Sequence, residues 1–373
     1  GEIENIRAAW QTLVARGRAD ELLGCVDALS RFYDSAAWFN EAHAVFLQAS
    51  EQLYQPDDWL ARAASLNRVG LFCLRVGDLA GAQAALQQSL NLLEGKPNGE
   101  ELGLCHTYLS RLYLRLGEMG KAMEQIQRSC AIFDALDAPL GQADARCQLA
   151  DMVYRSGKVE EAQAITIEAL RLTELSGDRR ALVTVLNQLG DIRAHLGDDQ
   201  GSLEYFQKSL EISRQLGDLF KAAIQLNNVG TVQYTMGDIP AAAASYRESL
   251  AICEQIGDRP GQAMALSNLA EALVAQAQYA EAEQIARRGL MISEVSNSTW
   301  EQLSCYCSLA EALTAAGAHE QARQVVGEGL ALSGSLGTIS SAARLFVILA
   351  RLESAAARRE RAVELCLALL DDP

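Results

Sequence analysis

Basic residues recur at intervals of forty residues in the first half of the chain: Arg75, Arg115, Arg155 and then His195. Arginine guanidinium groups present planar pairs of N–H donors that match carboxylates and phosphates. Three arginines in one register predict a ladder that binds an acidic ligand, and Arg68 and Arg111 would extend it. The alternative is that these arginines pair with acids of the chain itself, or with carbonyl groups at a helix end.

Amide side chains recur in a second register, a few positions earlier in the same repeat. The asparagines of this register that we predict to contact a ligand are Asn187, Asn227, Asn228 and Asn268. Asparagine is a mediocre helix former, so its recurrence indicates either ligand contact or hydrogen bonds that join neighbouring repeats. Four residues beside these registers complete the candidate binding set: Asp151, Tyr154, Asp191 and Tyr234.

Signatures of catalysis and of metal binding are missing from the sequence. It contains no G-x-x-x-x-G-K-[ST] phosphate loop, no H-E-x-x-H, no G-x-S-x-G and no Cys/His arrangement. The nine cysteines form no CxxC pair, which favours apolar core thiols in a reducing compartment. We therefore predict that the chain is not an enzyme and holds no metal or cofactor.

The elements that position these residues also repeat every forty residues. An apolar residue is followed by a small one at Gly70, Ser110, Ala150, Gly190, Gly230, Ala270, Ala310 and Ala350. A turn residue, usually glycine, stands seven positions later, and a second small residue stands twelve positions later. A fixed period of this size marks a solenoid, in which each repeat buries its apolar face against its neighbours. Apolar residues at helical spacing before and after the turn predict two helices in each repeat.

This period divides the whole chain and predicts an all-α, right-handed superhelical solenoid. We expect a lead-in helix in residues 1–20 and an atypical, aromatic-rich helix pair in residues 21–56. Residues 57–373 then form eight repeats of one continuous solenoid. The last copy lacks glycine at its turns and carries Arg358-Arg359-Glu360-Arg361, which favours a polar cap.

Composition narrows the class of partner and the compartment. The net charge of −16 disfavours binding to a nucleic-acid backbone. No signal peptide and no long apolar run is present, so we predict a cytoplasmic protein that does not enter a membrane.

Two stretches carry a resemblance to a known family: LNQLGDIRAHLGDDQGSLEYFQKSLEISRQLGD, from Leu186, and LNNVGTVQYTMGDIPAAAASYRESLAICEQIGD, from Leu226. They resemble tetratricopeptide repeats, in a variant whose period is forty residues rather than the usual thirty-four. Such longer repeats occur in the sensor arms of bacterial signal-transduction ATPases and of maltose-regulator-type transcription activators. Residues 3–10 also resemble the helix that precedes the repeat arm in those regulators.

The resemblance implies that the first helix of each repeat lines a concave wall. The arginine and asparagine registers would then face a groove, where asparagine would bond the backbone of an extended peptide. The expected function is a protein- or peptide-binding module that senses a ligand for a flanking ATPase or effector domain, and the bound segment would be acidic near the arginines. Two alternatives stay open, a small-molecule sensor and a self-associating structural scaffold.

Overall fold

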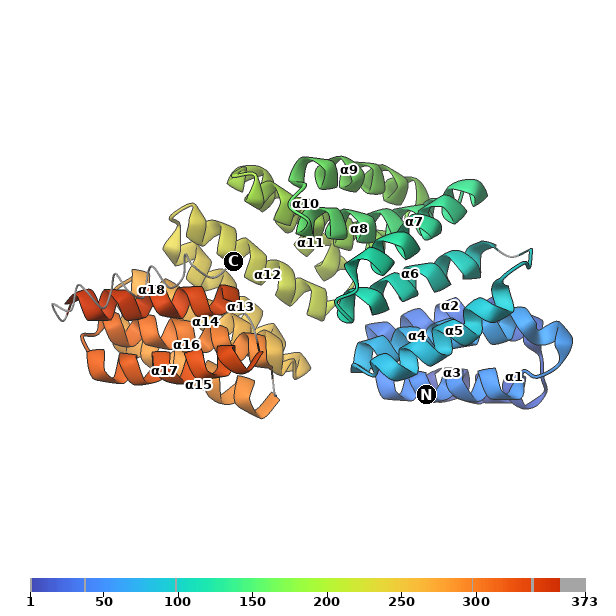
Figure 1. Ribbon diagram of the computed structural model, residues 1–373, viewed down its shortest axis with the longest axis horizontal. Coiled ribbons are helices and arrows are strands. Elements are labelled where there is room, and N and C mark those ends of the chain that lie inside the picture. Colours follow the sequence, from blue (N-terminus) through green and yellow to red (C-terminus); the bar gives the residue numbers. More distant parts are fainter. Residues whose placement is uncertain (1, 37, 98, 297, 337–338, 356–373) are drawn as a thin grey trace. The chain divides into compact units, whose positions relative to one another are not determined.

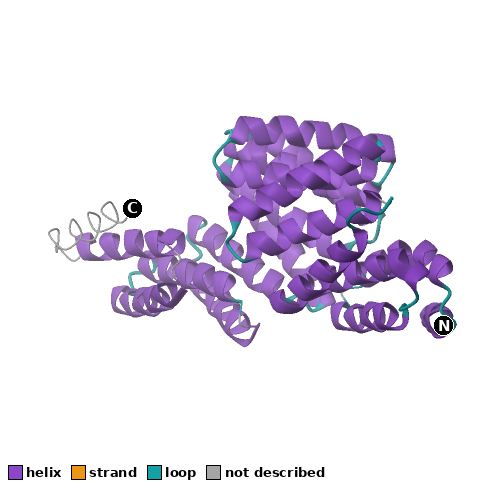
Figure 2. Ribbon diagram, turned by 45° about the vertical axis from the view of Figure 1, so that its right-hand side comes forward, coloured by secondary structure: helices purple, strands orange, loops and turns teal. Residues whose placement is uncertain are grey.

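The computed structural model of the chain consists of helices joined by short turns (Figure 1). It describes residues 2–36, 38–97, 99–296, 298–336 and 339–355. Within these ranges Figure 2 shows helix and loop and no strand. The predicted all-α solenoid is confirmed. Arg358–Arg361, and with them the proposed polar cap, lie outside the described residues.

The chain divides into two compact units, Gly1–Ile192 and Arg193–Pro373, and the division falls within α10. The first unit contains α1 (Glu2–Ala15), α2 (Ala19–Ser35), α3 (Phe39–Gln52), the 3-10 turn η1 (Pro56–Asp58), α4 (Trp59–Val76), α5 (Leu79–Leu93), α6 (Gly99–Arg115), α7 (Met119–Leu136), α8 (Pro139–Arg155), α9 (Val159–Ser176) and most of α10 (Arg179–His195). That the two units continue as one solenoid stays a prediction.

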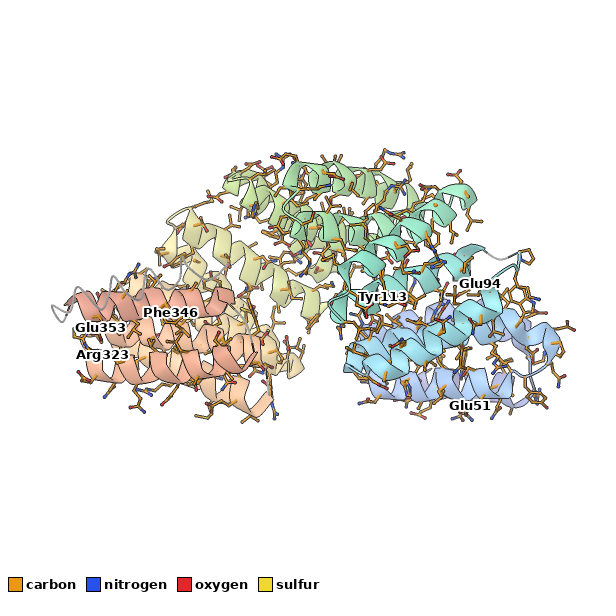
Figure 3. All side chains as sticks on the ribbon, in the orientation of Figure 1. Glu51, Glu94, Tyr113, Arg323, Phe346 and Glu353 are labelled. Carbon is orange, nitrogen blue, oxygen red and sulfur yellow. The ribbon has the colours of Figure 1, made fainter. Side chains whose placement is uncertain are left out.

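The second unit continues the alternation of helices. It contains α11 (Asp199–Gln215), α12 (Leu219–Thr235), α13 (Ile239–Ile256), α14 (Arg259–Ala275), α15 (Tyr279–Ser296), α16 (Thr299–Ala315), α17 (His319–Leu336) and α18 (Ile339–Ala355). From α4 onward, even-numbered helices are the first helices of their repeats and odd-numbered helices are the second helices. Arg323 of α17 and Glu353 of α18 lie together, with Nε and Oε1 3.0 Å apart (Figure 3).

The turns follow from the residues that stand at them. Gly77 has a φ of +84°, a left-handed conformation that glycine adopts without steric cost. Asp78 follows it and accepts a hydrogen bond from the backbone N–H of Gly81 at 2.9 Å, which caps α5. In the repeat that has Ala277 at the glycine position, φ is still +60°. The repeat geometry therefore sets this conformation even where the residue disfavours it.

The small residues mark where the two helices of a repeat touch, as predicted. A Cβ atom on Gly70 would lie 2.5 Å from Leu86 Cγ of α5, so only glycine allows this approach. In the next repeat the Ser110 hydroxyl donates to the Ala122 carbonyl at 2.8 Å. Both serine and alanine there are fully buried.

The lead-in helix and the first pair pack on the regular repeats through aromatic side chains. Trp10 of α1 packs edge-on against Phe46 of α3, with ring centroids 5.4 Å apart. Phe46 in turn stacks on Phe72 of α4 at 5.8 Å. These contacts join the atypical segment to the regular repeats.

The first helices of neighbouring repeats contact one another along each unit. In the first unit α4 contacts α6 and α6 contacts α8; in the second unit α12, α14, α16 and α18 make successive contacts. In the described ranges the second helices α5, α7 and α9 make no comparable contact with one another, nor do α13, α15 and α17. Because a curved stack brings together the helices on its inner side, the first helices line the inner side of each unit. We call this side the inner face.

No helix in the described ranges is both long and apolar enough to cross a membrane.

Candidate binding face

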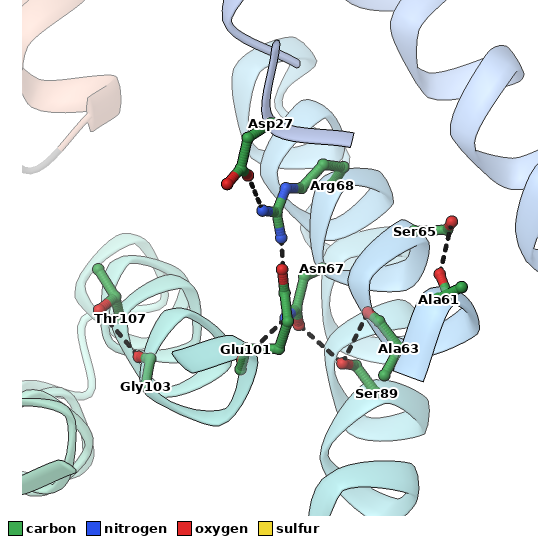
Figure 4. A network of polar contacts seen from close by, with 10 residues as sticks. All are labelled: Asp27, Ala61, Ala63, Ser65, Asn67, Arg68, Ser89, Glu101, Gly103 and Thr107. Atoms are coloured by element: carbon green, nitrogen blue, oxygen red, sulfur yellow. Dashed lines mark hydrogen bonds and ion pairs between the residues drawn. The ribbon is translucent and has the colours of Figure 1, made fainter. Parts of the chain in front are cut away.

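The sequence predicted that Arg68 lies on the accessible surface. In the structure its side chain is buried, and the residue is only 1% exposed. Its guanidinium forms ion pairs with Asp27 of α2 and with Glu101 of α6, the latter at 2.6 Å (Figure 4). The Asn67 amide donates to the Glu101 carboxylate at 2.7 Å and accepts from the Ser89 hydroxyl at 2.7 Å. The prediction that Arg68 contacts a ligand is therefore wrong, because the network occupies its donors and excludes solvent.

The charges of this network stabilise one another. Burial by itself would lower the pKa of Arg68, but the nearby Glu101, Tyr108 and Asp27 raise it above its usual value. A buried ion needs such partners, because an isolated charge in the protein interior is strongly unfavourable. The network joins four helices, α2, α4, α5 and α6, and is structural.

Arg75 and Arg115 are exposed on the first helices but bond to the preceding repeat. Arg75 makes a bidentate ion pair with Asp34 of α2, with Nε–Oδ1 at 2.9 Å and Nη2–Oδ2 at 3.1 Å. Arg115 donates to the carbonyl of Leu74, near the end of α4, at 2.5 Å. Both contacts are of the kinds that the alternative interpretation named, an internal acid and a carbonyl at a helix end.

Arg111 and Arg155 also have acceptors within the first unit. Arg111 pairs with Asp144 of α8 at 3.0 Å and donates to Gln148 Oε1 at 3.0 Å. Arg155 pairs with Asp151, one turn earlier on α8, at 2.8 Å. The arginine register is present, but each of its guanidinium groups is bonded internally. An excess of positive charge for an acidic ligand is not found here.

Two amide groups of this register join neighbouring repeats. The Asn268 amide of α14 donates to Asn227 of α12 at 2.9 Å, and Gln188 donates to the Cys147 carbonyl at 2.9 Å. In both bonds the two residues are 41 positions apart. Asn228 lies half-buried on α12. For Asn227 and Asn268 the structure favours the role of joining repeats.

A different group, on α8 and α10 of the first unit, has an excess of negative charge. Asp191 is solvent-accessible, yet burial raises the pKa of its carboxyl group to about 6; the hydrogen bond from Asn187, at 3.0 Å, opposes this shift and Asp151 adds to it. Tyr154 is half-buried, and burial, then the charges of Asp191 and Asp151, raise its pKa. Within the described chain no arginine or lysine pairs with Asp191. We call Asp151, Tyr154, Asn187 and Asp191 the acidic cluster.

The reason for this excess lies in the register between repeats. Arg111 and Asp144 are 33 residues apart, and the residue 33 positions after Asp151 is Thr184. Threonine supplies no counter-charge, so Asp151 pairs with Arg155 of its own helix. The residue 33 positions after Asp191 is Ile224, which supplies no counter-charge either.

The second unit contains a related group that sequence reasoning missed. Arg344 of α18 pairs with Glu271 of α14 at 2.7 Å and with Glu311 of α16 at 2.9 Å. Tyr234 of α12 is half-buried near them, and burial, then Glu271 and Glu311, raise its pKa. The signal was available, because Glu311 and Arg344 have the same 33-residue spacing as Arg111 and Asp144. His195, at the end of α10, is exposed.

A second missed contact joins distant parts of the first unit. Arg31 of α2 pairs with Asp178, which precedes α10, at 3.1 Å, although 147 residues separate them. Arg31 belongs to the same forty-residue register as Arg111, because it stands eighty residues, or two repeats, before it.

The described cysteines are free thiols, and most of them are buried or half-buried. Among the eight described cysteines Cys25 is exposed, and all eight are free thiols. Burial raises the pKa of Cys105 and of Cys305 to about 12, which keeps both thiols protonated. No group of three or more His, Cys, Asp or Glu residues in the described part of the chain is placed to hold a metal ion.

Solved structures share this arrangement of helices. The apo form of the quorum sensor NprR from B. thuringiensis matches with a TM-score of 0.72 at 14% identity, over 96% of this chain and 98% of that one. A Rap protein complexed with Competence and Sporulation Factor matches with a TM-score of 0.61 at 15% identity, over 92% and 99% of the two chains. At such identities the likeness concerns the fold alone.

A third solved structure is a larger protein. It is a signal transduction ATPase with numerous domains, with a tetratricopeptide repeat sensor, from Pyrococcus horikoshii; the TM-score is 0.62 at 16% identity. The match covers 88% of this chain and 52% of that one, so this chain spans about half the length of that protein.

Sequence comparison gives the family. No curated protein sequence matches the chain. A family model described as tetratricopeptide repeat matches residues 61–135, 141–215 and 220–294. These segments coincide with α4–α7, α8–α11 and α12–α15, and together they make up more than half of the sequence. The chain belongs to the tetratricopeptide repeat family.

Proposed function

We propose that this chain is a protein- or peptide-binding module and that the inner face of its first unit contacts the bound segment. The observation that carries the proposal is the Asp191 carboxylate, which is accessible, has no cationic partner among the described residues, and has a pKa raised by burial to about 6. Such a carboxylate gains more from an incoming cation than a fully hydrated one does.

The bound segment is therefore expected to carry arginine or lysine opposite the acidic cluster. This reverses the expectation from the arginine register, whose members already have internal acceptors. Tyr154 has a half-buried ring near the carboxylates, and an aromatic ring suits an extended segment with one cationic side chain.

The similar structures support binding rather than catalysis. One of them is a quorum sensor and another is complexed with Competence and Sporulation Factor, and both align along almost all of this chain. Helical repeats of this kind present extended inner surfaces suited to chain-like partners.

The direct test uses two fluorescent peptides of equal length, built on a glycine–serine background, one with arginines and one with aspartates. Fluorescence anisotropy with the whole chain should show tighter binding of the arginine peptide, and added salt should weaken it. Asp151→Asn with Asp191→Asn should weaken this binding by about tenfold, as expected when charge-assisted contacts of about 1.4 kcal/mol are lost.

The matched control removes two carboxylates from a second helix of the first unit, away from the inner face. Glu160 and Glu174 are exposed on α9, a second helix, so Glu160→Gln with Glu174→Gln should leave the affinity unchanged. Preferential binding of the aspartate peptide, or an unchanged affinity in the Asp151/Asp191 variant, would show that the acidic cluster is not the binding site.

We further propose that the chain is the ligand-sensing arm of a larger cytoplasmic regulatory protein. The support is the fold likeness to a signal transduction ATPase with a tetratricopeptide repeat sensor, together with the resemblance of residues 3–10 to a helix that precedes such arms. The full-length gene should encode a nucleotide-binding domain with a G-x-x-x-x-G-K-[ST] loop before residue 1. A full-length protein made only of these repeats contradicts this second proposal.

A further inference from the structure

Three large apolar side chains are highly exposed within ten residues of one another in the second unit. Met291 is 64% exposed, Val295 63% and Trp300 55%. Met291 and Val295 stand one turn apart on α15, and Trp300 is in the first turn of α16, after a two-residue connection. Among described large apolar residues only Tyr54 and Leu175 are also at least 55% exposed.

The repeat does not require apolar residues at these positions. Polar or charged residues stand in the register of Met291 at Arg171 and Glu211, and in the register of Trp300 at Glu100 and Arg180. Leu175, which is 66% exposed, is in the register of Val295, and Phe220, which is 50% exposed, is in that of Trp300. Each position can therefore be apolar in another repeat, but only in this repeat are all three residues large and apolar. Exposed apolar clusters on a folded protein mark interaction surfaces. Met291 and Val295 belong to a second helix, away from the inner face, whereas Trp300 stands in the first turn of the first helix α16.

The surroundings of this patch are acidic. Glu294 lies on the same turn of α15 and is exposed. Glu301 follows Trp300; burial, and to a smaller extent the neighbouring charge of Asp258, raise the pKa of its carboxyl group. The nearest cations in sequence, Arg287 and Arg288, are each ion-paired with another glutamate. In the described residues neither Glu294 nor Glu301 has an arginine or lysine partner.

We propose that Met291, Val295 and Trp300 form a docking surface for a basic amphipathic helix of a partner protein. Two apolar residues one turn apart form a ridge against which a helix with apolar residues at i, i+3, i+4 and i+7 can pack. Lysine or arginine beside the apolar residues of the partner helix would face Glu294 and Glu301. The partner helix is therefore expected to be basic. A second copy of this chain would bring the same carboxylates together, and complementarity therefore argues against self-association here.

The probe is a fluorescent helical peptide of about four turns, with leucine at i, i+3, i+4 and i+7 and lysine elsewhere. Its two controls replace lysine with glutamate or scramble the leucine positions. Anisotropy with the Asp151→Asn/Asp191→Asn form of the whole chain, in which the acidic cluster has lost its charge, should show binding of the lysine peptide alone. Met291→Ser, Val295→Ser and Trp300→Ser together should weaken it by at least about tenfold, as for loss of a central apolar contact.

Matched variants separate the apolar and charged contributions. Leu175→Ser removes an equally exposed apolar residue from α9 of the first unit and should have no effect. Glu294→Gln with Glu301→Gln should weaken binding by a few-fold, about 1 kcal/mol or less, and reduce its salt dependence. If the triple variant fails to fold by circular dichroism, Trp300→Ser alone replaces it, with a smaller expected loss.

Several results would overturn the proposal. They are unchanged binding to the triple variant, equal binding of the glutamate peptide, and absence of lysine-peptide binding to the unmodified chain. A concentration-dependent dimer in sedimentation that the triple variant abolishes, without peptide binding, would identify a second copy as the occupant instead. The Asp151/Asp191 variant should bind the lysine peptide normally, so failure here is distinguishable from failure of the inner-face proposal.

Discussion

Asp144 of α8 pairs with Arg111 of α6 at 3.0 Å, across the junction between two repeats. In the second unit Glu311 of α16 and Arg344 of α18 make the same contact with the charges exchanged. The position after the small residue of one repeat thus faces the residue 33 positions later. This register determines which charges on the inner face are neutralised within the chain and which are left for a partner.

Exchange of charge at this junction gives the first prediction. Arg344→Glu should place three carboxylates together and destabilise the second unit, and adding Glu311→Arg should restore part of the loss. Because these side chains are partly exposed, we expect a coupling of about 1 kcal/mol or less. Urea unfolding of the two single variants and the double variant measures it. Equal destabilisation in the single and double variants would contradict the assigned pairing.

Removal of Arg68 should be far more costly than removal of Arg75. Arg68→Ala leaves Glu101 buried without its cation, an effect of about 3–5 kcal/mol. Arg75→Ala breaks an exposed pair with Asp34, which is worth about 1 kcal/mol or less. Unfolding midpoints in urea compare the two variants directly. Similar midpoints would mean that the buried network does not stabilise the first unit as described.

The raised pKa of Asp191 predicts an unusual dependence of stability on pH. The pKa of its carboxyl group rises from the ordinary 3.8 to about 6 on folding, so the folded chain binds this proton more tightly than the unfolded chain does. The contribution of Asp191 to stability is therefore greatest below 3.8 and is lost as the pH rises through about 6. Asp191→Asn should raise Tm above that pH and change it little in acid.

The same proton should control ligand binding. A cationic peptide on the acidic cluster favours the charged carboxylate, so affinity should fall as the pH is lowered through about 6. Calorimetry in buffers of different ionisation enthalpy should detect proton release on binding. A pH-independent affinity would place the peptide away from Asp191.

Arg155 should act as an internal competitor of the ligand. Its pair with Asp151, at 2.8 Å, neutralises one of the two carboxylates of the acidic cluster. Arg155→Gln should therefore strengthen binding of the arginine peptide, by about 1 kcal/mol or less since the pair is exposed. Arg75→Gln is the control and should leave the affinity unchanged. Weaker binding of the aspartate peptide in Arg155→Gln, with no gain for the arginine peptide, would instead support an acidic ligand.

The sequence carried enough information to predict the elements of this fold. Helix pairs, their turns and the close approach at Gly70 all follow from a local period, because each depends on residues within about one repeat. The register also predicted which side chains would share a helix face. It did not predict the partners of those side chains, as Arg68 and Asn268 illustrate.

The sequence by itself determined the family, the helix pairs and the rows of equivalent positions, since these arise from spacing along a single helix. Only the tertiary structure decided that Arg68 is buried, that Arg75 and Arg115 bond to the preceding repeat, and that Asp191 is left without a cation. The physical reason is that burial and ion pairing depend on residues 33 to 41 positions away, which meet only when the repeats stack. Charge that recurs along the chain is therefore not the same as charge available to a ligand.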